Sequence, residues 1–153
     1  MSLRDRIVTD LKAAMKAKDT QRLSTLRLIS ASIKDRDIAA RTGDGDDAGV
    51  SDDEVLSLLT RMVKQRAESA RTYEEAGRLE LAAEERAEID VIEQFLPRQM
   101  DEAEITAAID AEISDLGAGS IRDMGRVMGA LKAKYAGRMD FGRVGPMVKA
   151  RLG

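Results

Sequence analysis

The spacing of the apolar residues is the feature that most constrains how this chain can fold. Leu3, Ile7 and Leu11 lie four positions apart near the start, and Ile105, Ile109 and Ile113 repeat the interval further on. This spacing places side chains on one face of an α-helix. Aliphatic residues must also build the core, because the chain has no Trp and only four other aromatic residues. The sequence therefore predicts an all-α protein.

Start and stop signals divide this pattern into seven expected helices. Ser51 with Glu54, and Asp101 with Glu104, have the spacing of capping boxes that open helices. Pro97 restricts the residue before it and so favours a helix end there. We expect helices at 3–18, about 20–41, 51–77, 79–95, 101–116 and 120–135, and a short last helix after residue 140.

The connections between these helices predict two domains. Four helices with short links indicate a four-helix bundle-like N-terminal domain, residues 1–96, and the remaining three indicate a small helical domain, residues 97–153. Leu96–Met100 is the expected hinge. Pro146 allows two alternatives, because the last helix either begins late, near Gly145, or bends at the proline.

The residue inventory narrows the chemistry that the chain can perform. It contains neither Cys nor His, which excludes thiol catalysis, disulfides, thiolate metal sites and imidazole bases. Phosphate-binding loops, zinc spacings and dinucleotide fingerprints are also absent, so we expect no cofactor, no metal and no self-contained catalytic constellation. No apolar run is long enough to span a bilayer, and the charged start lacks the apolar region of a secretory signal. The expectation is a cytoplasmic protein that does not enter membranes.

Two acidic segments invite interpretation as metal sites. Asp44, Asp46 and Gly49 match part of a calcium loop, but Ala48 and Val55 stand where further ligands are needed. A helix connector is the favoured interpretation of that loop. The carboxylates between residues 74 and 93 are interpreted as a solvated helix face, since no His accompanies them.

Charge is distributed unevenly along the chain. Residues 122–151 hold eight Lys or Arg against two Asp, and residues 4–41 hold ten Lys or Arg against five Asp. Residues 44–115 carry a net charge of −14. This asymmetry concerns partners more than fold.

The helix expected at 120–135 carries the candidate site. At about 100° per residue, its apolar side chains form one continuous arc, and Gly125 and Gly129 fall beside Arg122 and Arg126. Bare backbone next to two guanidinium groups suits the approach of a phosphate, and a helix start at Ser120 adds N–H groups. Close packing of another helix on the glycines is the alternative. The full set of predicted nucleic-acid-binding residues is Arg122, Gly125, Arg126, Gly129, Lys132, Lys134 and Arg138.

Several segments of the chain resemble the GatB/YqeY family, and specifically its stand-alone YqeY-like proteins. The resemblance covers almost the full length and is most specific at the Leu-Pro hinge and the Met-Gly-x-Val-Met-Gly segment. The segments are Arg27–Lys34, Tyr73–Ala82, Glu88–Pro97, Asp123–Gly129 and Gly137–Asp140.

The resemblance implies a partner. The C-terminal domain is similar to the tail of the B subunit of the tRNA-dependent aspartyl/glutamyl amidotransferase, where that tail contacts tRNA. The family is described as carbon-nitrogen ligase with glutamine as amido-N-donor, although the chemistry lies in domains that this chain lacks. We therefore expect a tRNA-associated accessory protein of the amidotransferase type. The alternative is a helical adaptor that binds an amidotransferase or an aminoacyl-tRNA synthetase.

Overall fold

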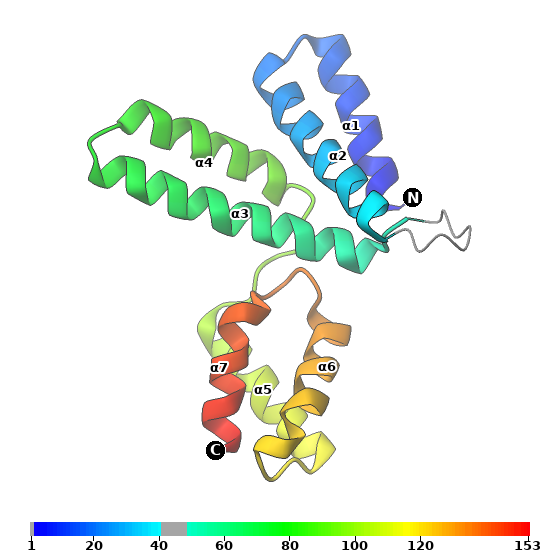
Figure 1. Cartoon of the computed structure of the whole chain (residues 1–153), viewed down its shortest axis with the longest axis vertical. Helices are drawn as coiled ribbons and strands as arrows, with labels where there is room; N and C mark the ends of the chain where they lie inside the picture. Colours follow the sequence, from blue (N-terminus) through cyan, green and yellow to red (C-terminus); the bar gives the residue numbers. More distant parts are fainter. Residues whose placement is uncertain (1, 41–48) are drawn as a thin grey trace. The chain divides into compact units, whose positions relative to one another are not determined.

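Seven α-helices and one short 3-10 turn make up the part of the chain that the computed structural model describes, residues 2–40 and 49–153 (Figure 1). No strand occurs in these residues, and the prediction of an all-α fold is confirmed. The elements are α1 (Leu3–Ala17), α2 (Thr20–Ala40), α3 (Asp52–Glu75), α4 (Leu79–Glu93), α5 (Glu102–Leu116), the turn η1 (Ile121–Asp123), α6 (Met124–Tyr135) and α7 (Phe141–Leu152).

Contacts divide the chain into two compact units, Met1–Leu96 and Pro97–Gly153. Each unit has its own cluster of buried apolar side chains. Independent folding of the two units as domains stays a prediction.

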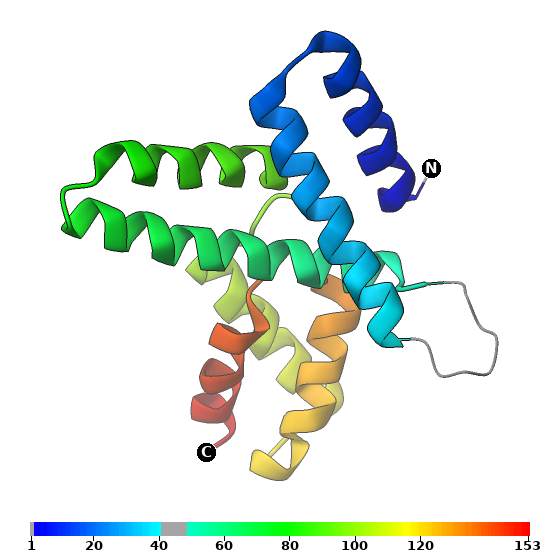
Figure 2. The same ribbon diagram turned by 45° about the horizontal axis from the view of Figure 1, so that its top comes forward.

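The N-terminal unit consists of two helical hairpins. α1 pairs with α2, α3 pairs with α4, and the two hairpins pack across each other (Figures 1 and 2). Fully buried aliphatic residues from three helices meet at this crossing, among them Leu26, Ile29, Leu59 and Ile92. Burial of these side chains, each worth about 1.5–3 kcal/mol, holds the two hairpins together.

Local hydrogen bonds set the helix boundaries close to the predicted ones. The Ser51 hydroxyl accepts from the backbone N–H of Glu54 at 3.2 Å, and α5 begins with a complete capping box between Asp101 and Glu104. α5 ends at Gly117, whose φ of 61° suits a residue without a Cβ.

Ile38 of α2 and Met15 of α1 are apolar residues that face solvent instead of the core. Ile38 is 61% exposed and Met15 is 50% exposed. Ile38 follows the buried Ile33 by five residues, which turns it by about 140° around α2 to the solvent side. Ala14 holds the buried position next to Met15 in α1.

The C-terminal unit packs α5, α6 and α7 around a small aliphatic core. Val127, Leu131, Val144 and Val148 are fully buried in it. The short segment after Pro97 is fastened to this unit, because the backbone N–H of Met100 donates to the carbonyl of Arg138 at 2.9 Å.

The last helix starts before its proline. α7 begins at Phe141, with the Asp140 carboxylate accepting from the N–H of Gly142 at 3.0 Å, so of the two alternatives for this helix the late start near Gly145 is wrong. A proline inside a helix crowds the preceding residue and the carbonyl four residues back. Here both of those positions, Gly145 and Gly142, are glycines, so the preceding residue has no Cβ to meet the proline ring.

Candidate nucleic-acid interface

At the start of the candidate site, the side chains of Ser120 and Asp123 already bind free backbone N–H groups. Ser120 and Asp123 form a capping box, in which the Asp123 carboxylate accepts from the N–H of Gly119 at 3.0 Å and of Ser120 at 3.4 Å. These backbone donors lower the pKa of Asp123. The Ser120 hydroxyl accepts from the N–H of Arg122 at 3.3 Å. The helix start is therefore not the open anion site that the sequence suggested.

Gly125 and Gly129 lie exposed on α6 with free space around them. A Cβ added at either position would meet no atom within 4 Å. Close packing of another helix on these glycines, the alternative considered from the sequence, does not occur in the described part of the chain. The two glycines leave a strip of bare helix backbone facing solvent.

Three of the five predicted basic residues make contacts inside the C-terminal unit. Arg126 donates to the carbonyl of Leu116 at 2.9 Å and to the Asp123 carboxylate at 3.2 Å, which ties α6 to the end of α5. Arg138 donates to the carbonyl of Arg98 at 3.1 Å.

The third of these residues is Lys134, which is hydrogen-bonded to the carboxylate of Glu112 on α5. Glu112 is only 4% exposed. The hydrogen bond and the negative charge of Glu112 raise the pKa of Lys134. These contacts give Arg126, Lys134 and Arg138 structural roles.

Arg122 and Lys132 are the two predicted basic residues whose side chains form no hydrogen bond or ion pair within the described residues. Both are exposed, and neither side chain has a partner among residues 2–40 and 49–153. The interval of seven residues between Gly125 and Lys132 returns to the same helix face. We call the surface formed by Arg122, Gly125, Gly129 and Lys132 the glycine lane.

Sequence reasoning missed Glu112, although a signal for it exists. Ile105, Ala108, Ile109 and Glu112 share one face of α5, and all four are buried. A carboxylate on an apolar stripe is costly to bury unless it is paired. The position of Glu112 on the apolar face of α5 therefore indicated a cationic partner from a neighbouring helix.

The acidic segments that invite interpretation as metal sites lie partly within the described residues. No group of three or more Asp and Glu side chains gathers there in a way that could hold an ion. Asp44 and Asp46 of the rejected calcium loop lie outside the described residues. None of the helices that the structure describes is long and apolar enough to cross a bilayer.

The family model described as Yqey-like protein matches residues 4–152 of the chain. Among curated proteins, "Altered inheritance of mitochondria protein 41, mitochondrial" of Lachancea thermotolerans is 34% identical over 107 residues, which is 70% of this chain and 54% of that protein. Its namesake in Pyrenophora tritici-repentis is 29% identical over 136 residues, 87% of this chain and 71% of that protein. The chain thus spans about half the length of the first of these relatives and about seven-tenths of the second.

These names correct the expected location. The relatives are called mitochondrial, so the prediction of a cytoplasmic protein is contradicted and we withdraw it. The prediction considered only an apolar secretory signal, whereas mitochondrial targeting segments are basic and amphipathic.

Proposed function

The chain belongs to the YqeY-like protein family, and from this premise we propose that it is a tRNA-associated accessory protein of the amidotransferase type, which binds tRNA without an active site of its own. The observation that carries the proposal is the glycine lane. Two unengaged cations, Arg122 and Lys132, stand at the ends of an exposed strip of bare backbone in the described part of the chain.

The lane suits a phosphate backbone for steric and electrostatic reasons. Without side chains at Gly125 and Gly129, a ligand can approach the α6 backbone closely. Two cations that no carboxylate of the described residues neutralises remain available to a polyanion. Phosphate contacts of this kind supply most of the sequence-independent affinity for nucleic acids.

The identity of the RNA rests on resemblance. The amidotransferase tail to which the C-terminal unit is similar contacts tRNA, whereas the names of the curated relatives mention no RNA. Since the chain has neither Cys nor His, binding is better supported than amide transfer.

Fluorescence anisotropy with labelled tRNA at several salt concentrations tests the proposal. The unaltered chain should bind with an affinity that falls steeply with salt, and Arg122→Glu/Lys132→Glu should bind at least tenfold more weakly. Arg61→Glu/Arg71→Glu is the matched control, because it makes the same charge change at two exposed α3 residues that lack partners in the described structure. Equal, salt-insensitive binding by all three proteins would contradict the proposal. Undetectable binding by the unaltered chain would instead favour the adaptor function.

A further inference from the structure

A second surface that could bind anions runs along α2. It includes Arg27 and Lys34, the two ends of a segment that carries the family resemblance and has no role in the proposed function. Four side chains on it can donate hydrogen bonds, and we call them the donor stripe: Thr20, Ser24, Arg27 and Lys34. Their intervals of four, three and seven residues keep them on one helix face, and fourteen steps along α2 give the stripe a length of roughly 21 Å. Ala31 occupies the same face between the two cations, where its short side chain leaves the helix surface open.

The stripe faces solvent, and its polar groups are unused. All four residues are exposed, and none of their side chains has a hydrogen-bond or ion-pair partner in the described parts of the chain. Thr25 shows the contrast, because it is buried and its hydroxyl donates to the carbonyl of Gln21 at 3.3 Å. The donors of the stripe are therefore not part of the packing of the N-terminal unit.

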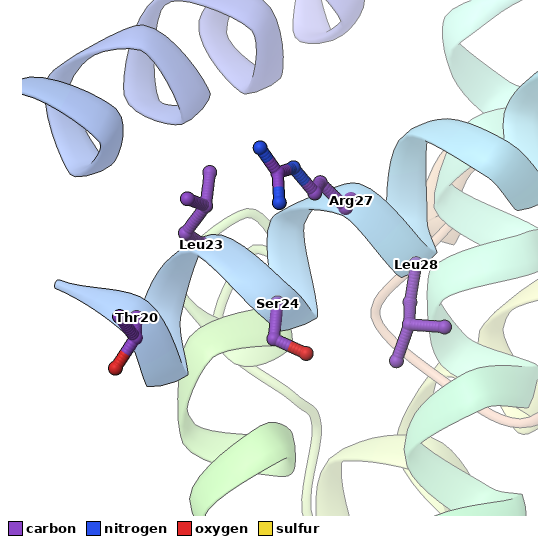
Figure 3. Close-up of a pocket in the computed structure, with 5 residues that line it drawn as sticks. All are labelled: Thr20, Leu23, Ser24, Arg27 and Leu28. Carbon is purple, nitrogen blue, oxygen red and sulfur yellow. The ribbon is translucent and has the colours of Figure 1, made fainter. Parts of the chain in front are cut away.

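The first half of the stripe borders a depression of about 340 Å³. Figure 3 looks onto this face of α2, with Leu23 and Arg27 toward one edge of it and Ser24 and Leu28 toward the other. Thr20 completes the lining at the start of the helix. A guanidinium group, two hydroxyl groups and two leucine side chains, all from α2, thus border this open depression.

The carboxylates near the stripe lie beside it. Glu84 and Glu88 of α4 line another depression, of about 410 Å³, together with Ser24. Neither Arg27 nor Lys34 lines this depression. On α2 itself, Asp35 lies about 100° around the helix from Lys34, and Asp37, about 60° from it, is ion-paired with Arg4. The two cations are therefore the part of the stripe most open to a polyanion.

We infer that the donor stripe binds the phosphate backbone of the same tRNA, as a second contact in addition to the glycine lane. This inference rests on the proposed function. Arg, Lys, Ser and Thr are side chains that commonly contact phosphate oxygens, and the length of the stripe allows it to meet more than one phosphate. It holds no aromatic side chain on which a base could stack, which favours contact with the backbone.

The test measures tRNA binding by the full chain with separate changes in the two surfaces. Arg27→Glu/Lys34→Glu should weaken binding at least tenfold. Loss of two phosphate contacts should also reduce the slope of log K against log salt by roughly 1.5. Arg61→Glu/Arg71→Glu should stay within twofold of the unaltered chain. Circular dichroism of each variant checks that its helix content is unchanged.

A variant without a charge change separates the effect of direct contacts on tRNA affinity from the effect of long-range electrostatic attraction. Thr20→Ala/Ser24→Ala keeps the net charge and favours helix, so it should weaken binding a few-fold while leaving the salt slope unchanged. If Arg27→Glu/Lys34→Glu binds like the control, the inference is overturned, and Arg122→Glu/Lys132→Glu then decides the proposed function alone. If only the α2 variant loses binding, the donor stripe stands and the glycine lane is wrong. Undetectable binding by the unaltered chain would overturn both.

Discussion

Lys134 on α6 is hydrogen-bonded to the carboxylate of Glu112, a charged side chain buried in the core of the C-terminal unit. The Lys134 side chain is 54% exposed, so one end of the pair is solvated and the other is not. A buried carboxylate without its partner is strongly destabilising, whereas replacement of both charges is often tolerated.

Lys134→Met should therefore lower the midpoint of thermal unfolding by several degrees. Glu112→Gln combined with Lys134→Met should recover most of the loss, because no charge is then left buried. Lys132→Met is the control, since it removes a lysine of the same helix that has no partner in the described structure. A midpoint that falls equally for Lys132→Met and Lys134→Met would show that Glu112 does not need its lysine.

Gly129→Ala should stabilise the chain by about 0.5–1 kcal/mol, because alanine favours helix and its Cβ meets free space. The same change should weaken tRNA binding by filling the glycine lane. Gly117→Ala is the opposite control: it also has free space, but its φ of 61° strains any residue with a Cβ. Denaturant unfolding should show stabilisation for the first variant and destabilisation for the second.

Acid should weaken the C-terminal unit through Glu104. Its hydrogen bond from Arg98, 2.7 Å to one carboxylate oxygen, is the main cause that lowers its pKa from 4.5 to about 2. A lowered folded-state pKa stabilises the fold above the ordinary pKa, and this contribution is lost as the pH falls from about 4.5 toward 2. Thermal unfolding between about pH 2 and pH 6 should show this loss in the unaltered chain and a weaker one in Glu104→Gln. Arg98→Met should show a loss between those of the unaltered chain and Glu104→Gln, because the backbone N–H of Asp101 still donates to the Glu104 carboxylate, and the double variant should match Glu104→Gln.

The effects of substitutions at Gly145 and Pro146 on the free energy of unfolding should be coupled. Gly145→Ala alone should destabilise α7 by about 1 kcal/mol, because its Cβ would crowd the proline ring. In the Pro146→Ala background the same change should stabilise, since the new Cβ would lie 3.8 Å from the Met124 methyl group in ordinary contact. A double-mutant cycle by denaturant unfolding measures the coupling, and strictly additive effects would contradict it.

The helices were predictable because their signals are local. The capping box of Asp101 and Glu104 and the apolar intervals around Ile109 lie within a few residues of the structure that they determine. Ile38 shows the limit of this reasoning. Whether its side chain faces the core or the solvent depends on the rotation of about 140° around α2 that separates it from Ile33.

The candidate site was predictable only as a helix face. Angular positions placed Gly125 and Gly129 beside Arg122, and both glycines are exposed. The contacts of Arg126 and Lys134 could not be foreseen, because their partners, the Leu116 carbonyl and Glu112, come from α5. Helical periodicity describes one element at a time and does not tell which groups a neighbouring element supplies.

The apolar clusters have a consequence for how such a chain can be assembled in evolution. One cluster takes its described members from residues up to Leu96, and the other takes them from Met100 onward. A gene rearrangement that joined residues 97–153 to an unrelated protein would carry every described member of the second cluster with it. The prediction that the two units fold independently then implies that the fused segment needs no compensating substitutions in its interior.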